Sequence, residues 1–267
     1  VTGANASGNY LYFGVREFGM SALCNGMALH GGVIPYSGTF LVFADYSRAA
    51  LRLGALMGER VIHVMTHDSI GLGEDGPTHQ PVEHVASLRA MPNMTVFRPC
   101  DGVEAAECWE LALRNDTGPS TLALTRQKVK SARSVHTDEN LCSKGGYVLS
   151  DAEGAKAVLI ATGSEVEIAM EAQAALAEKG VPVRVVSMPS MDLFEQQSAN
   201  YQAETLGGKL PKVAVEAGVR FGWDRWIGHD GGFVGMSSFG ASAPYQDLYQ
   251  HFGITAEAVV AAVDAQL

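Results

Sequence analysis

Apolar side chains recur three and four residues apart in two segments near the start of the chain. This spacing predicts helices over residues 15–31 and 39–58, the first ended by two glycines and the second capped by Thr39. A short strand is predicted between them, over 33–37. After a polar stretch rich in Gly and Asn, the chain is therefore expected to begin with helix, strand and helix.

Short runs rich in β-branched residues then alternate with helical patterns. Strands are predicted over 60–68, 95–99 and 120–126, and helices over 81–91 and 102–115. Such alternation is typical of a mainly parallel sheet with helices on its faces.

The alternation stops in a polar stretch, residues 127–145, and restarts beyond it. The second half is predicted to contain a helix over 165–180, a polar loop after residue 190, a closing helical stretch, and strands over 155–164, 181–190, 210–218 and 231–240. We therefore expect two consecutive α/β domains, each a mainly parallel sheet with helices on both faces. Their expected bounds are 1–130 and 146–267, joined by a linker over 131–145.

Composition and charge narrow the class of protein. Apolar residues make up 47% of the chain and charged residues 18%, which favours a compact protein over a disordered one. A net charge of -10 without a Lys or Arg cluster argues against binding to nucleic acid or to anionic membranes. No stretch approaches the roughly 18 apolar residues of a membrane span, and the first residues lack a signal-peptide pattern. We expect a cytoplasmic protein whose four cysteines, lacking C-x-x-C spacing, are reduced and mostly buried.

The densest polar constellation is the segment THDSIGLGEDGPTHQP, which follows a predicted strand. Turn geometry explains most glycines, so the three glycines alone are weak evidence of a site. His67, Asp75 and His79 together make this loop the best site candidate, because open parallel sheets bind ligands at the carboxyl ends of their strands. The histidines are twelve residues apart, which disfavours zinc and suits sugar hydroxyls, phosphates or proton transfer.

Two further features allow alternative interpretations. Glu17 lies in an otherwise apolar helix beside Arg16. Either the two residues form a structural ion pair, or the Glu17 carboxyl lies in an apolar pocket, where its pKa is raised and it shares a proton with a ligand nitrogen. Phe40, Phe43 and Tyr46 stand three apart on the second predicted helix. That spacing usually means core packing, but the three rings would also suit a flat heteroaromatic ligand.

At these residues the sequence resembles the transketolase family. The resemblance covers the whole chain in order, through VREFGM, TFLVFADYSR, HDSIGLGEDGPTHQPVEHVASLR, NMTVFRPCD, LTRQ, ATGSEVEIAM, VVSMPSMDLF and GMSSFGASAP. The run HDSIGLGEDGPTHQP is the most specific of these motifs. Deoxyxylulose-phosphate synthase and the pyruvate dehydrogenase β subunit share the two-domain plan with different loops, whereas dihydroxyacetone synthase is a closer alternative.

The resemblance implies a cofactor site in the first domain, the pyrimidine-binding domain of a thiamine diphosphate enzyme. Glu17 matches the catalytic glutamate that hydrogen-bonds a pyrimidine nitrogen of thiamine diphosphate. Phe40, Phe43 and Tyr46 match the aromatic pocket around the pyrimidine.

The resemblance also implies substrate contacts. His79 matches a catalytic histidine near the donor's C1 hydroxyl and carbonyl oxygen, and Asp75 an aspartate that reads the C2 hydroxyl. His67 and Arg126 match phosphate-binding positions. The implied reaction moves a two-carbon ketol unit from a ketose phosphate, such as xylulose 5-phosphate, to an aldose phosphate, such as ribose 5-phosphate or erythrose 4-phosphate, in the pentose phosphate pathway.

The family's metal motif is the remaining element of the resemblance. Thiamine enzymes hold Mg²⁺ or Ca²⁺ through GDG and a downstream Asn, and no such pairing occurs in this sequence. We expect no metal ligand here, an incomplete first domain, and an N-terminal diphosphate-binding domain outside these residues. The chain alone should then be inactive, with the active site at a homodimer interface. The alternative from another class is a non-catalytic dimerisation or regulatory module that kept the fold.

Overall fold

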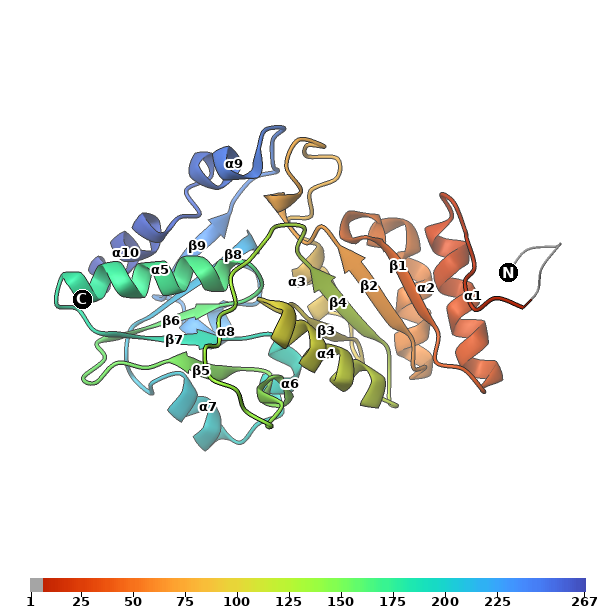
Figure 1. Ribbon diagram of the computed structural model, residues 1–267, viewed down its shortest axis with the longest axis horizontal. Helices are drawn as coiled ribbons and strands as arrows, with labels where there is room; N and C mark the ends of the chain where they lie inside the picture. The colour runs from red at the N-terminus through yellow and green to blue at the C-terminus, as the bar shows by residue number, and fades with distance from the viewer. Residues whose placement is uncertain (1–6) are drawn as a thin grey trace.

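The protein contains two sheets that lie side by side with helices around them (Figure 1). The structure, a computed structural model, describes residues 7–267. The first sheet is entirely parallel, in the order β1-β2-β4-β3. Its strands are β1 (Tyr36–Phe40), β2 (Ile62–Thr66), β3 (Thr95–Phe97) and β4 (Ser120–Leu124).

Helices cover both faces of the first sheet. They are α1 (Glu17–His30), α2 (Ala44–Met57), α3 (His84–Arg89) and α4 (Gly102–Arg114), with short 3-10 turns η1 (Leu41–Phe43), η2 (Ile70–Leu72) and η3 (Leu141–Lys144). One core cluster joins α2 and α3 to the sheet, and another joins α4 and η3 to its opposite face. Helix α1 packs against α2 and the edge strand β1.

The second sheet has the order β5-β7-β6-β8-β9 and is parallel except for β5, which pairs antiparallel with β7. The strands are β5 (Tyr147–Ser150), β6 (Ala157–Ala161), β7 (Val183–Ser187), β8 (Lys212–Val219) and β9 (Gly232–Met236). All five residues of β6 are buried. Alternate β6 side chains enter two different core clusters, as expected for a central strand covered on both faces.

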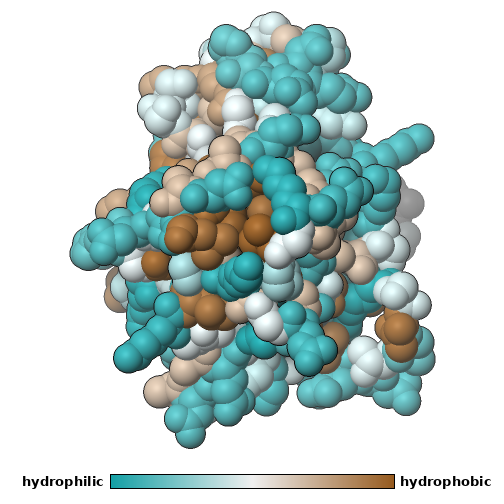
Figure 2. All heavy atoms as spheres, turned by 90° about the vertical axis from the view of Figure 1, so that its left-hand side faces the viewer, coloured by the Kyte–Doolittle hydropathy of each residue, from teal (hydrophilic) through white to brown (hydrophobic). Residues whose placement is uncertain are grey.

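Two groups of helices supply those cores. On one face lie α5 (Glu165–Glu178), α9 (Tyr245–His251) and α10 (Ala256–Asp264). On the other lie α6 (Met191–Glu195), the end of α7 (Ala199–Thr205), and α8 (Asp224–Ile227). This end of the molecule presents a largely hydrophilic surface with an apolar patch near its centre (Figure 2). No helix in residues 7–267 is long and apolar enough to cross a bilayer.

The two-sheet α/β architecture predicted from the sequence is confirmed, whereas two local predictions were wrong. Thr39 lies inside β1, and the second helix begins only at Ala44, after η1. The segment after residue 190 is not a loop, because α6 and α7 form there with the capping serines Ser190 and Ser198. All four cysteines are buried and free, as predicted.

Candidate active site

Three aromatic rings line the carboxyl end of β1. Phe40 is the last residue of β1, Phe43 lies in η1, and Tyr46 in the first turn of α2, so they do not share one helix as predicted. The rings of Phe40 and Phe43 are parallel within 2°, with centroids 6.0 Å apart, and the Tyr46 ring lies 5.7 Å from Phe43. The turn from strand to helix thus produces an aromatic wall of two parallel, half-buried rings and an exposed Tyr46 ring tilted by 44° from Phe43.

The two histidines of the conspicuous loop lie against this wall. The His67 ring stacks on Phe40 at a centroid distance of 4.0 Å, and His79 meets Phe43 edge-on at 5.4 Å. Strands β1 and β2 are parallel neighbours, with Phe40 opposite Thr66, so both chain segments leave the same edge of the sheet. The structure therefore brings together the aromatic trio and both predicted histidines at the edge where α/β sheets bind ligands.

His67 has an unusual backbone and a charged neighbourhood. Its φ of 61° lies in the left-handed region, which non-glycine residues rarely adopt and which recurs at functional sites. Burial lowers the pKa of His67; the positive charge of Arg126 lowers it further, and Asp75 opposes them. Arg126 and Asp75, both exposed, therefore act electrostatically on the same imidazole.

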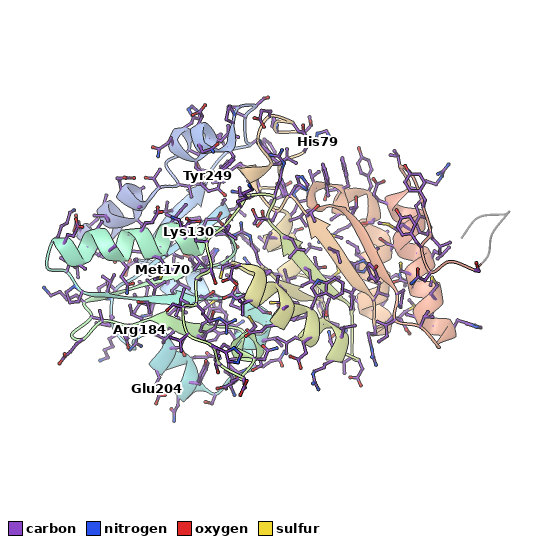
Figure 3. The ribbon with its side chains drawn as sticks, viewed as in Figure 1. His79, Lys130, Met170, Arg184, Glu204 and Tyr249 are labelled. Carbon is purple, nitrogen blue, oxygen red and sulfur yellow. The ribbon has the colours of Figure 1, made fainter. Side chains whose placement is uncertain are left out.

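The loop that carries Asp75 and His79 is fastened to the second sheet's domain. The buried amide of Gln80 donates to the Gly73 carbonyl at 2.8 Å and to the Ala241 carbonyl at 2.9 Å. His79 itself is half-buried, and its Nδ1 lies 2.9 Å from the Thr78 hydroxyl. Figure 3 shows His79 at the rim of the molecule, on the side where α9 carries Tyr249. The loop is thus held in place while its tip remains open to a ligand.

Glu17 is the first residue of α1 and is half-buried. The Arg16 guanidinium donates to the Phe13 carbonyl at 2.7 Å, and no ion pair joins Arg16 to Glu17 within the described residues. The structural ion-pair interpretation therefore has no support. Helix α1 packs against β1 and α2, which carry Phe40 and Tyr46. The role of Glu17 toward a ligand nitrogen stays a prediction.

Sequence reasoning missed the buried ion network behind the site. Arg98, 1% exposed, follows β3 and donates from Nε to Asp68 at 2.9 Å and from Nη1 to Glu165. Burial alone would lower the pKa of Arg98, but Glu165, Asp68 and Glu216 raise it well above its usual range. Because Asp68 directly follows His67, the network fastens the site to the second domain. The only hint in the sequence is a charged residue in the run NMTVFRPCD.

Among residues 7–267, one group of three side chains could hold a metal ion. His84 Nε2 lies 3.2 Å from Asp45 Oδ2, and Nδ1 lies 3.7 Å from Glu83 Oε2. Both carboxylates are exposed, and the imidazole is already hydrogen-bonded to Asp45. We assign no metal to this group.

The fold and the candidate site define a class: a two-sheet α/β protein in which aromatic rings and histidines gather at the carboxyl ends of parallel strands. Two family models match the chain, one described as transketolase, pyrimidine binding domain, over residues 2–131 and one as transketolase-like C-terminal domain over residues 145–255. A transketolase of Sinorhizobium medicae is 58% identical over 98% of this chain. The chain belongs to the transketolase family.

Solved structures agree with this assignment. A transketolase from Pichia stipitis, described as a complex with sedoheptulose 7-phosphate, has a TM-score of 0.90 and 39% identity over 95% of this chain. A structure described as a split gene transketolase, inactive β4 tetramer, has a TM-score of 0.80 and 25% identity over 95% of this chain and 82% of its own. The chain spans 38% of the length of the Sinorhizobium relative and 37% of the Pichia protein.

Proposed function

We propose that this chain is the pyrimidine-binding and C-terminal part of a transketolase that moves a two-carbon ketol unit from a ketose phosphate to an aldose phosphate. The observation that carries the proposal is the aromatic wall of Phe40, Phe43 and Tyr46 with His67 and His79 against it. Family membership supports the reaction class. Xylulose 5-phosphate and ribose 5-phosphate are the proposed donor and acceptor.

The residues present fit the pyrimidine end of thiamine diphosphate. Two parallel rings 6.0 Å apart and a tilted tyrosine offer aromatic surface to a flat heterocycle. The half-buried Glu17 begins a helix packed on the strand that ends in Phe40, so its carboxyl group is suited to hydrogen-bond a ring nitrogen. When bound, thiamine diphosphate supplies the nucleophilic carbon and the electron sink for breaking a ketose carbon–carbon bond.

The loop after β2 supplies the proposed substrate contacts. His79 would contact the donor's C1 hydroxyl and carbonyl oxygen, and Asp75 would read the C2 hydroxyl. His67 and Arg126 would bind the phosphate, and their shared electrostatic environment supports this pairing. The guanidinium offers a planar fork of donors that matches phosphate oxygens.

The metal and the diphosphate belong to a part of transketolase that this chain does not span. Mg²⁺ or Ca²⁺ would be held with the diphosphate by a separate diphosphate-binding domain, and the site would form at a homodimer interface. The domain bounds 1–130 and 146–267 and a cytoplasmic location are part of the same proposal.

The test is ketol transfer by the holoenzyme, in which this chain is combined with a transketolase diphosphate-binding domain. With thiamine diphosphate, Mg²⁺, xylulose 5-phosphate and ribose 5-phosphate, we expect sedoheptulose 7-phosphate. Glu17→Ala should lower turnover at least about a hundredfold, the lower end for a lost acid–base group. Glu153→Ala, at an exposed acid in the second domain, is the control and should behave like the parent. Near-parental turnover in Glu17→Ala would remove Glu17 from the mechanism.

A second candidate, a non-catalytic assembly module, is favoured by one observation: the split gene relative is described as an inactive tetramer and is matched over 82% of its length. Calorimetry with thiamine diphosphate and Mg²⁺ on the isolated chain bears on both candidates. We expect no tight binding without the diphosphate-binding domain. Submicromolar affinity would contradict the placement of the diphosphate site outside this chain.

A further inference from the structure

The hydroxyl of Tyr249 is a junction between the two domains. Tyr249 lies in α9, packed under the second sheet, and its hydroxyl contacts groups from three other segments. It lies 2.7 Å from Glu165 Oε1, 3.2 Å from Gln127 Nε2 and 3.3 Å from Ser69 Oγ. The side chain is 9% exposed, so water competes little for these bonds.

The direction of each hydrogen bond follows from the donors available. A phenol has one proton to donate, and the Glu165 carboxylate oxygen can only accept, so Tyr249 donates to Glu165. Its lone pairs then accept from the Gln127 amide and from the Ser69 hydroxyl. Ser69 Oγ in turn accepts from the Gly71 backbone at 3.1 Å. All the capacity of the hydroxyl is used, which fixes its partners in one arrangement.

These partners adjoin the proposed phosphate-binding residues. Ser69 is two residues after His67, and Gln127 directly follows Arg126. The Gln127 side chain also packs so closely on Gly71 that a Cβ at that glycine would meet it. The hydroxyl therefore ties together the two chain segments that present the imidazole and the guanidinium, although neither of those groups touches Tyr249.

The anchor of this junction is rigid. Glu165 Oε1 also accepts from the Ser164 hydroxyl at 2.8 Å, and Oε2 accepts from the Ala217 backbone at 3.0 Å and from Arg98. Glu165 is fully buried. A carboxylate with this many donors cannot turn, so the position of Tyr249, and through it of both segments, is set by the second domain.

We propose that Tyr249 is a positioning residue, through which the C-terminal domain sets the spacing of His67 and Arg126 for one phosphate group. This inference rests on the proposed function, in which those two residues bind the substrate phosphate. It gives the C-terminal domain a part in substrate recognition without a catalytic residue of its own.

Tyr249→Phe tests the proposal, because it removes the hydroxyl and keeps the ring. Tyr147→Phe is a matched control: Tyr147 is 5% exposed and donates at 2.8 Å to Glu104, a buried glutamate that also accepts a serine hydroxyl. Each substitution removes one buried phenol-to-carboxylate hydrogen bond and leaves the glutamate with a serine donor, and Tyr249→Phe also removes the acceptor of Gln127 and Ser69. Only Tyr249 adjoins the proposed phosphate site.

Two measurements separate positioning from stability. In the holoenzyme, Tyr249→Phe should raise KM for ribose 5-phosphate roughly threefold to tenfold, the range for one lost hydrogen-bonded contact, with kcat near parental. Activity toward D-ribose, measured with a ketose donor that also lacks a phosphate, should not change. In the full chain without cofactor, the NMR signal of the His67 ring during titration with inorganic phosphate should show a similar loss of affinity, and Tyr147→Phe should match the parent.

The outcomes distinguish the inference from the proposed function. A parent holoenzyme without ketol transfer would sink the proposed function, while the phosphate titration would still test Tyr249. An active parent with unchanged KM and unchanged phosphate affinity in Tyr249→Phe would overturn the inference alone. Equal losses of activity toward ribose 5-phosphate and D-ribose would also overturn it, because they would indicate general damage rather than a lost phosphate contact.

Discussion

Replacing the buried Arg98 by methionine should lower the free energy of unfolding more than replacing an exposed arginine does. The guanidinium is 1% exposed and donates to Asp68 at 2.9 Å and to the Thr162 carbonyl at 3.0 Å, with Glu165 also hydrogen-bonded. Methionine fills much of the same volume without the charge. The cost therefore comes mainly from the carboxylates left behind.

Those carboxylates are not equally affected. Glu216 keeps Arg89 at 2.9 Å and the Trp223 indole at 2.7 Å, and Glu165 keeps Tyr249. Asp68 and Glu165 each lose the one cation with which they form an ion pair in residues 7–267, but Glu165 also keeps donors from Ser164 and Ala217. Breaking one side of a buried pair costs about 3–5 kcal/mol. For chains of roughly this size, that lowers Tm by about 6–20 °C.

Thermal and urea unfolding followed by circular dichroism will measure the loss. Arg114→Met is the control, since Arg114 is 74% exposed and pairs with Glu110 at 2.8 Å on the surface of α4, so its loss should cost at most about 1 kcal/mol. Adding Asp68→Asn to Arg98→Met should recover part of the loss, because the stranded charge is then removed. A loss for Arg98→Met no larger than that of the control, or strictly additive effects in the double variant, would refute this reasoning.

Three further predictions concern acid stability, backbone fit and ligand binding. Burial lowers the pKa of His63 to about 4, whereas in the unfolded chain the imidazole takes up a proton near pH 6.5. The folded state should therefore lose up to about 3 kcal/mol of stability as pH falls from 6.5 toward 4. His63→Leu should lose less stability over this range in urea titrations. Gly145→Ala should cost about 2–5 kcal/mol of stability, because at φ 76° an added Cβ would meet the backbone of α6. Gly154→Ala, at φ 70° in open space, should cost only about 1–2 kcal/mol. Equal melting temperatures of the two variants would contradict this. The pKa of His67, followed by NMR, should lie below its ordinary value and rise when phosphate binds, and an unshifted pKa in the free chain would remove the burial and Arg126 effects from the argument.

Periodicity in the sequence was sufficient for most helices and strands of both sheets. It failed at Thr39, where a good capping residue lies inside β1, because pairing with Met65 of β2 outweighs the local preference for a cap. It also missed the antiparallel edge strand β5, which is only four residues long. Strand pairing depends on a partner distant in the chain, and no local window contains that information.

For the candidate site too, part could be predicted from the sequence and part depends on the tertiary structure. The sequence by itself determined the residue types, because the strand end before His67, the loop around His79 and the rings near Phe40 are all local patterns. Only the tertiary structure decided that two histidines twelve residues apart lie against the same aromatic wall, and that Tyr249, far along the chain, reaches Ser69. The physical reason is that hydrogen bonds and ring contacts act over a few ångströms, while the residues that make them are brought together by the packing of two separate sheets.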